Sequence, residues 1–558
     1  MIRKILCLLL ALVLLLPAAA AAESSPASLR VLLRRLSLAD RADLTLTGRY
    51  LARAENGTEL LLPENAKVTV LLENRQLTLF SGGISVSAGK TLSLLRQASG
   101  ETEPGIRFNL QSGFYPGDLS LSVSEDRLQP VLTLPLEKYL QGVVPYEMGD
   151  GFPEEALKAQ AVCARTYALS RVNEKNAWDV VDTTNDQVFR GLPASSPKSG
   201  KAVEDTAGLV LTCDGKLITA WYSASNGGQT ELPANVWGGE APRCFAMTDD
   251  PWDTANPAST VRTCTLNRNG TELSPAFVKQ LRQAALADPA LRERIPDEEN
   301  FRLRELTGLE LVTPRFPAPS RLMTQLKVSF LLPVPKAAET AGSEEEGDVD
   351  ITALISALPV TVTLDLFPDT VISLGLSVSG ANNEIITLQE NETSFTLTAG
   401  RFGHGVGLSQ RGAQQMAAAD GKTFREILAF YFPGAVLKEY EGEKAPLPTP
   451  PPLLARDPGP APTATPRPTL MPVTVPEPLP EGARLASVEN IAEDSSLNLR
   501  AQPSAGAEIL LRLLCHQKLL VLEKSDVPGW VRVRTDAAEG YVMESFLVYE
   551  EDPDAPKG

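Results

Sequence analysis

Histidine and cysteine are scarce in this chain. Its 558 residues include two histidines, His404 and His516, and six cysteines, with no CxxC pair among them. Zinc sites draw on closely spaced Cys and His ligands, so the sequence predicts no metal site and no cofactor. Once Cys7 in the N-terminal apolar run is set aside, an odd number of cysteines remains, and the count defines no disulfide framework. Cys244 and Cys264 flank one loop-like stretch, and a pairing between them stays open.

Basic residues are outnumbered by acidic ones. Lys and Arg total 52 against 69 Asp and Glu, which gives a formal net charge of −17 at pH 7. Nucleic-acid binding needs a basic surface, so the sequence predicts no nucleic-acid partner. A neutral sugar chain stays open as a ligand. We interpret the acidic run at 344–350 as a solvated loop.

The longest apolar run is at the N-terminus. Residues 1–22 begin with Arg3 and Lys4, continue as an apolar run and end in alanines that suit a cleavage site. We interpret them as a signal peptide. An uncleaved membrane anchor is the alternative, because the run is almost long enough to span a bilayer. Either interpretation places the rest of the chain outside the cytoplasm, secreted or anchored to the outer face of the membrane.

The length predicts about two to four domains at roughly 150 residues each. Period-two alternation with Gly and Asn turns predicts a β-rich N-terminal part over 29–134. Residues 135–440 mix helical and strand patterns and form the core, with an elaboration at about 265–378. Residues 444–480 are dense in proline, which favours an extended spacer, and 482–549 form a separate domain. The predicted fold class is α+β: a mixed, β-rich core with packed helices around a cleft, plus a small all-β domain.

The stretch 135–171 organises the core. Apolar residues at helical spacing lead up to Pro145, which we expect to end that helix because its ring clashes with the preceding turn. Glu147 follows, so its carboxylate is free to point into a cleft. A second helix is expected to begin near Pro153. This second helix presents a small and nearly uncharged face, made of Ala156, Ala159, Gln160, Cys163, Ala164 and Tyr167.

Two glycine-bearing segments carry further candidate residues. A strand predicted at 217–222 leads into the loop SASNGG, where adjacent glycines permit positive φ and bring backbone N–H groups close to a ligand. A second predicted strand, FTLTA, leads into a glycine-rich run around His404. A helix that Gly421 ends and another at 424–432 follow this run.

These motifs together resemble the stage II sporulation protein D family of peptidoglycan lytic transglycosylases. The resemblance is carried by VVPYEM, FPEEALKAQAVCARTYAL, SNGGQTE with VWGG, and GHGVGLSQRGA. It implies that Glu147 is the general acid and base. Glu147 would protonate the oxygen between MurNAc and GlcNAc, then deprotonate the muramic C6 hydroxyl, which closes on C1 to give a 1,6-anhydro sugar. One carboxylate is then sufficient, whereas most glycosidases need two, and its pKa must be raised by desolvation.

The resemblance also implies the residues that bind the substrate. In the family, a segment similar to 178–191 lines the cleft, although Phe189 stands here where a tyrosine is usual. Some relatives bind zinc through His or Cys near the SASNGG loop, and this chain has neither between Trp221 and Val236. The implied substrate-binding set is Gln160, Arg165, Tyr167, Asp186, Gln187, Ser223, Ser225, Asn226, Gly227, Gly228, His404, Ser409 and Gln410.

Residues 482–549 resemble a bacterial SH3-like domain, which implies a small β-barrel that holds cell-wall or other surface ligands. Trp530 is expected in its core. Two functions stay open: an exported lytic transglycosylase, a glycan-cleaving lyase, that acts on peptidoglycan glycan strands, and a non-catalytic amidase enhancer or wall-binding protein of the same fold, with a cell-wall amidase as its partner. Either protein would be secreted or associated with the cell wall.

Overall fold

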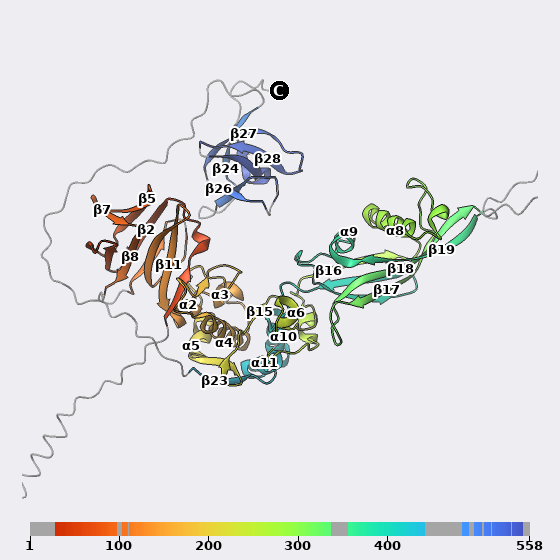
Figure 1. The fold of residues 1–558 in the computed structure, drawn as a ribbon, viewed down its shortest axis with the longest axis horizontal. Helices are drawn as coiled ribbons and strands as arrows, with labels where there is room; N and C mark the ends of the chain where they lie inside the picture. Colours follow the sequence, from red (N-terminus) through yellow and green to blue (C-terminus); the bar gives the residue numbers. More distant parts are fainter. Residues whose placement is uncertain are drawn as a thin grey trace, which may run out of the picture. The chain divides into compact units, whose positions relative to one another are not determined.

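The computed structural model divides the chain into two units (Figure 1). Unit 1 comprises residues 1–35 and 131–449, and unit 2 comprises residues 36–130 and 450–558. With 22% helix and 40% strand, the fold is mixed, as predicted. The expected signal peptide, the acidic run and the proline-rich spacer lie outside the described residues. The structure describes residues 28–97, 103–109, 111–240, 242–335, 355–440, 483–489, 496–504, 507–514, 516–536 and 538–550.

The N-terminal part of unit 2 is built from antiparallel strands, as the alternating pattern predicts. Along β5 every second side chain is buried, including Val68 and Val70, because successive side chains of a strand point to opposite faces. One sheet has the order β7 (Ile84–Gly89), β6 (Gln76–Ser81), β5 (Lys67–Glu73), β2 (Arg41–Thr47), β9 (Gly105–Phe108). Antiparallel pairs also join β10 (Asp118–Ser124) to β8 (Thr91–Arg96), β8 to β3 (Tyr50–Ala54), and β3 to β4 (Glu59–Leu62).

The C-terminal part of unit 2 is all-β, with a core that includes Leu499, Val531 and Val533. Over the described residues its seven strands form a sheet that is not closed into the expected barrel, because β26 and β30 are left as edges. Trp530 is half-buried and is not part of the core, contrary to the prediction. The strand order is β26 (Ile509–Leu514), β25 (Ser496–Arg500), β29 (Glu539–Met543), β28 (Trp530–Arg534), β27 (Lys518–Lys524), β24 (Arg484–Val488), β30 (Leu547–Tyr549).

One buried helix, α4 (Glu154–Arg171), forms the centre of unit 1. It begins directly after Pro153, as predicted, and its side chains from Ala156 to Leu169 are buried almost all round. The small residues on its face let neighbouring elements approach closely. The neighbours are α2 (Leu136–Gln141), α5 (Pro197–Asp205), α10 (Gln410–Asp420), α11 (Phe424–Tyr431) and β13 (Leu209–Cys213) (Figure 1).

The chain turns sharply before Glu147, at a different residue from the one predicted. Helix α2 ends at Gly142, and Pro145 lies in the first turn of the short helix α3 (Val144–Glu147) rather than ending a helix. Proline suits a first turn because the N–H it lacks has no partner there. A Cβ on Gly142 would lie 2.4 Å from the ring of Phe189. The break thus falls at Gly142, where the Phe189 ring leaves no room for a side chain, and Glu147 is the last residue of α3.

Short strands bring distant segments of unit 1 together. The prediction of one continuous strand over 217–222 is largely wrong. This part of the chain contains two strands of two residues each, β14 (Lys216–Leu217) and β15 (Tyr222–Ser223). Strand β15 pairs in parallel with β22 (Leu408–Ser409), which places the SASNGG loop beside the glycine-rich run. Further pairs join β13 to β14 and to β23 (Val436–Glu439), and β1 (Ser28–Leu32) to β11 (Arg127–Pro135) and β12 (Val180–Val181).

The elaboration of unit 1 has its own hydrophobic core, which includes Phe277, Phe330 and Phe395. The predicted strand FTLTA belongs to its first sheet and leads into the glycine-rich run. Across the described residues, no helix is both long and apolar enough to span a membrane. The sheets are β16 (Val261–Asn267), β21 (Ser394–Gly400), β20 (Ile385–Glu390) and β17 (Glu305–Pro314), β18 (Met323–Pro335), β19 (Ile355–Asp365), with helix α8 (Pro275–Ala287).

Candidate active site

A cavity of about 660 Å³ in unit 1 contains the central carboxylate of the sequence motif. Of the residues predicted to form the site, six line it: Glu147, Tyr167, Asp186, Ser223, His404 and Gln410. Residues from both glycine-bearing segments thus meet the last residue of α3 around one space. The other lining residues are Arg171, Thr184, Asn185, Trp221, Tyr222, Ala224, Trp237, Phe402 and Gly403.

The Glu147 carboxylate is half-buried and hydrogen-bonded. Its Oε1 accepts the backbone N–H of Val188 at 2.8 Å, and the side chains of Tyr222 and Gln410 also bond to it. Burial raises the pKa of Glu147 above its ordinary value, because desolvation penalises the charged form. The three hydrogen bonds oppose that rise but do not cancel it. Glu147 therefore keeps its proton to a higher pH than an exposed glutamate.

Gln187 positions Tyr222 against Glu147 from behind the cavity. Its Nε2 donates to the Tyr222 hydroxyl oxygen at 3.1 Å and to the carbonyl of Ala164 at 3.2 Å. Its Oε1 accepts the Tyr139 hydroxyl at 3.3 Å. With its oxygen accepting from Gln187, Tyr222 is left to donate its own proton toward Glu147. Sequence reasoning missed Tyr222, although it directly precedes the SASNGG loop.

Gln160 supports Gln410 in a similar way. It is fully buried in α4, and its Oε1 accepts from Nε2 of Gln410 at 3.4 Å. Gln410 starts α10 and lines the cavity, whereas Gln160 does not. Of these two predicted residues, Gln410 touches the cavity and Gln160 orients it.

Both ring nitrogens of His404 are held by the backbone. Nδ1 accepts the N–H of Val406 at 3.0 Å, and the ring bonds to the Tyr222 carbonyl. Burial lowers the pKa of His404 to about 4, so the ring is neutral at higher pH. One edge of the ring meets Trp237, with ring centroids 5.1 Å apart. His404 therefore fixes the glycine-rich run against β15 and presents a ring to the cavity.

The polar end of the cavity surrounds Asp186. Its Oδ1 accepts the Tyr167 hydroxyl at 2.7 Å, and its Oδ2 accepts the N–H of Val181 at 2.8 Å. Arg171 adds an ion pair at 3.5 Å and lies 6.0 Å from the centre of the Tyr167 ring. Three partners therefore fix the position of Asp186 at this end of the cavity.

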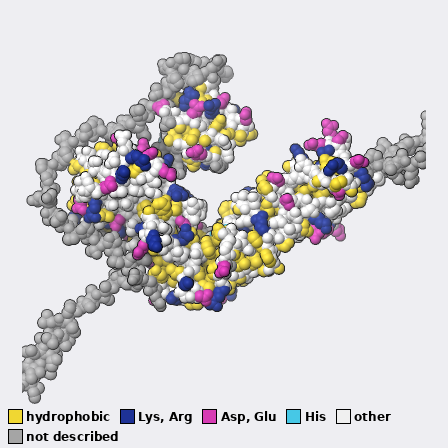
Figure 2. Space-filling view, in the orientation of Figure 1, with side chains coloured by type: hydrophobic (Ala, Val, Ile, Leu, Met, Phe, Trp, Pro, Cys, Tyr) yellow, Lys and Arg dark blue, Asp and Glu magenta, His cyan; other side chains and the backbone are white. Residues whose placement is uncertain are grey.

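Two tryptophans, Trp221 and Trp237, form one wall of the cavity. The rings of Trp221 and Trp237 stack with centroids 4.8 Å apart, and Trp237 belongs to α6 (Pro233–Trp237). Trp237 is 51% exposed and Phe402 is 45% exposed, which is unusual for rings of this size. Figure 2 shows hydrophobic side chains gathered on the face over α6, α10 and α11. Sequence reasoning noticed VWGG but assigned Trp237 no role.

The polar residues of the SASNGG loop are used within the fold. Asp253 accepts hydrogen bonds from the Ser225 hydroxyl at 2.8 Å and from the Ser409 hydroxyl at 2.7 Å. Asp250, the N-cap of α7 (Pro251–Ala255), accepts from Asn226 at 2.8 Å. Neither aspartate was predicted, although Asp-Pro at a helix start is a recognisable capping signal. Of the predicted ligands, Ser225, Asn226, Gly227, Gly228, Ser409, Gln187 and Arg165 do not line the cavity.

Arg165, another residue predicted to bind the substrate, also has its partners within the fold. It is fully buried in α4 and forms a two-pronged ion pair with Glu137, each prong 2.8 Å long. It also donates to the carbonyl groups of Val203 and Leu209. These bonds join α4 to α2, α5 and β13. Arg165 therefore stabilises the helices behind the cavity.

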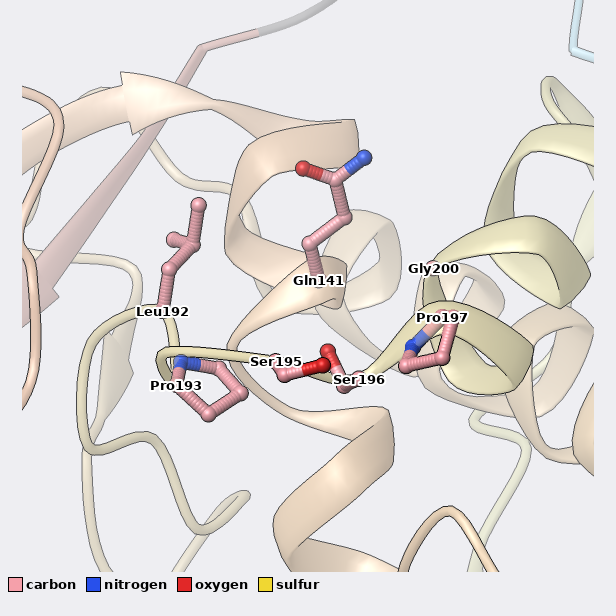
Figure 3. A pocket seen from close by; sticks show the side chains of 7 residues that line it. All are labelled: Gln141, Leu192, Pro193, Ser195, Ser196, Pro197 and Gly200. Atoms are coloured by element: carbon pink, nitrogen blue, oxygen red, sulfur yellow. The ribbon is translucent and has the colours of Figure 1, made fainter.

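A smaller cavity of about 260 Å³ lies beside α2 and the start of α5. Figure 3 shows Gln141 above the Ser195–Ser196 segment, with Pro193 and Pro197 on either side. None of its seven lining residues is ionisable. The backbone N–H groups of Lys198 and Ser199, in the first turn of α5, donate hydrogen bonds to the Asp150 carboxylate. This cavity offers no acid–base chemistry.

The donor set around the cavity does not fit a zinc site. Segment 221–236 contains no Cys or His. Within the described part of the chain, no three His, Cys, Asp or Glu side chains are grouped so that they could hold a metal ion.

The fold and cavity define a mixed α/β domain with a desolvated acid in an aromatic-walled cleft. Residues 124–213 match the family described as Stage II sporulation protein, and residues 495–548 match the family described as Bacterial SH3 domain. The chain thus carries a stage II sporulation protein D domain and a bacterial SH3 domain, as the motifs predict. The first match contains Glu147, and the glycine-rich run lies beyond it.

Relatives extend over more of the chain. It is 29% identical over 309 residues to the "Amidase enhancer" of Bacillus subtilis (strain 168), covering 54% of this chain and 40% of that protein's length. It is 25% identical over 338 residues to "Stage II sporulation protein D" of the same organism, covering 58% of this chain and 79% of the relative. A Brachyspira hyodysenteriae (strain ATCC 49526 / WA1) protein, "Uncharacterized protein BHWA1_00569", is 28% identical over 359 residues, covering 61% and 78%.

Proposed function

We propose that this protein acts at the cell wall as an exported lytic transglycosylase that cleaves the MurNAc–GlcNAc bond of peptidoglycan glycan strands. The observation that carries the proposal is the Glu147 carboxyl, whose pKa is raised by burial at the wall of a cavity large enough for sugar rings. A general acid must start protonated, and burial favours the protonated form of Glu147.

Glu147 acts twice in this reaction. It first donates its proton to the glycosidic oxygen, and the C1–O bond breaks. The resulting carboxylate then takes the proton of the muramic C6 hydroxyl, whose oxygen bonds to C1 to form the 1,6-anhydro ring. Proton and bond counts balance without water. Hydrogen bonds from Val188, Tyr222 and Gln410 stabilise the carboxylate between the two steps.

The geometry around Glu147 supports a one-carboxylate mechanism. Hydrolysis requires a second carboxylate free to act as a base or nucleophile. Asp186 is the other carboxylate in the cavity lining, and it is bonded to Tyr167, Val181 and Arg171. Asp186 is therefore engaged by three partners of the fold and is not free to act on a water molecule or on the sugar. The Trp221–Trp237 wall offers a surface against which apolar faces of sugar rings pack.

Replacement of the acid tests the proposal. Glu147→Gln keeps the size and hydrogen-bonding shape of the side chain but carries no transferable proton. We expect release of 1,6-anhydro products from purified peptidoglycan to fall by about 10²–10⁴-fold, with an unchanged melting temperature. Mass spectrometry of the digest measures the products. As a control, Glu426→Gln removes an exposed helix-capping carboxylate of α11 far along the chain and leaves the rate unchanged. Wild-type rates in Glu147→Gln would sink the assignment.

Stimulation of a wall amidase without glycan cleavage is the second candidate function. The relative named "Amidase enhancer" supports it. In that case the protein alone releases no anhydro sugar, and it raises the rate of an added cell-wall amidase. Digests with the protein alone, the amidase alone and both together distinguish the two functions.

A further inference from the structure

Two buried cysteines face each other in unit 1. Cys213 ends β13 and Cys244 lies in the loop after α6, and both are free thiols in the structure. The Cys213 thiol contributes to the raised pKa of Cys244, which places the two side chains close together. Their flanking residues are joined as well: Asp214, after Cys213, forms an ion pair with Arg243, before Cys244. The ion pair between the neighbours holds the two backbone segments side by side, which brings the two cysteines together in the folded chain.

The segment between these cysteines forms most of the aromatic wall. It contains Trp221, which directly precedes β15, together with Tyr222 of β15 and Trp237 of α6. Phe245, next to Cys244, packs on Trp221 at 5.5 Å between ring centroids and on Phe432 at 5.6 Å. A covalent link between the cysteines would close this segment into a loop whose base lies directly behind the wall.

We propose that Cys213 and Cys244 form a structural disulfide when the chain folds in an oxidising compartment. One cysteine thiolate attacks an external disulfide, such as oxidised glutathione, and releases one thiol. The other cysteine attacks the mixed disulfide and releases the second thiol. The S–S bond forms, both cysteines are oxidised, and the external disulfide is reduced to two thiols that take up the two protons.

The exchange belongs to folding rather than to the finished structure. Burial raises the pKa of the Cys244 thiol to about 12, so in the folded chain it stays protonated and reacts slowly. The same burial shields the finished bond from reductants. Cys264 is not placed for this role: it lies in β16, paired in register with Leu397, while Cys244 faces Cys213. The pairing of Cys244 with Cys264 left open by the sequence is thus disfavoured.

Peptide mapping tests the link in the full chain. The protein, refolded in a buffer of reduced and oxidised glutathione, is denatured, alkylated with iodoacetamide without reductant and digested with trypsin. We expect peptides 202–216 and 244–262 to appear as one disulfide-linked species that disappears on reduction, with Cys163 and Cys264 alkylated. Alkylation of Cys213 and Cys244 in the unreduced sample would overturn the proposal.

A stability measurement gives a second readout. Disulfides that close loops of this length typically stabilise a fold. We therefore expect wild-type protein that is unfolded, reduced and refolded in dithiothreitol to melt about 5–10 °C below protein refolded in the glutathione buffer. The Cys213→Ser/Cys244→Ser chain should melt at one temperature with and without reductant, and Cys264→Ser should keep the wild-type shift. An unchanged wild-type melting temperature in reductant counts against a structural bond. The inference requires only folding in an oxidising compartment, so it stands or falls separately from the proposed chemistry.

Discussion

At the residue scale, the protonation of Glu147 controls the proposed reaction. Because the acid form is the active one, kcat/KM should fall as pH rises through the raised pKa of Glu147. His404 should not contribute to this decline in kcat/KM at higher pH, because its pKa is lowered to about 4 and its ring is neutral there. The measurement is kcat/KM on soluble glycan strands across the pH range. A rate that climbs over that same interval would mean that the carboxylate, rather than the acid, is the reactive form.

Removing the hydrogen bond from Tyr222 to Glu147 should shift the descending limb of the pH–rate profile in a known direction. Tyr222 stabilises the charged form of Glu147, so Tyr222→Phe should raise the pKa of Glu147 and shift the limb to higher pH. Tyr146→Phe is the matched control, since Tyr146 adjoins Glu147 in the chain but packs against Arg190, 5.4 Å from its ring centre. A limb that stays in place in Tyr222→Phe, or that moves equally in Tyr146→Phe, would contradict this role.

Trp237 should contribute binding rather than chemistry. It is half exposed at the cavity wall and stacked on Trp221, and it is not among the groups that shift the pKa of Glu147. For Trp237→Ala we expect KM to rise about 10-fold, which corresponds to about 1.4 kcal/mol, with kcat nearly unchanged. Val236→Ala, beside it and outside the cavity lining, is the control. A large loss of kcat with unchanged KM would assign Trp237 to the chemical step instead.

Sequence patterns located the reactive residue better than its partners. Pro145 predicts a helix break just before Glu147, whereas the break lies at Gly142 and Glu147 ends the short helix α3. The roles of Tyr222 and Trp237 were not predicted, because they depend on which segments meet in space. The loop residues Ser225 and Asn226 were predicted as ligands because polar side chains beside glycines suit either a ligand or an internal partner. Only the position of the two α7 aspartates decides between these roles.

At the element scale, the pairing of β15 with β22 assembles the site. Gly407 lies just before β22 with φ +72°, and a Cβ there would lie 2.2 Å from the carbonyl oxygen of Trp221. Gly407→Ala should therefore destabilise unit 1 by about 3 kcal/mol and reduce cleavage, because the clash cannot be relieved by a side-chain rotation. Chemical denaturation followed by tryptophan fluorescence measures the loss.

Gly421 is the natural comparison for Gly407. It caps α10 with φ +62°, and a Cβ added there would meet no atom within 4 Å, so Gly421→Ala should cost only about 1 kcal/mol of conformational strain. Similar losses in both variants would show that backbone conformation, and not the approach of β15, sets the requirement for glycine.

Individual elements were largely predictable, because each has a local signal. The helix after Pro153, the αL cap at Gly421 and the strand FTLTA all follow from spacing and capping residues. The segment 217–222 was misjudged as one strand. Ile218 and Ala220 are buried in an irregular segment between β14 and β15, and burial of every second residue gives the same alternation as a strand.

At the scale of the whole molecule, the SH3 domain and the cavity belong to different units, so binding and cleavage should be separable. We expect a chain lacking residues 441–558 to cleave soluble glycan strands at the wild-type rate and to sediment far less with insoluble cell walls, by about 10-fold or more. Glu147→Gln should show the reverse pattern, full sedimentation without cleavage. If the truncated chain bound walls as well as the intact protein, the aromatic cleft itself would hold the wall, and the SH3 domain would serve another ligand.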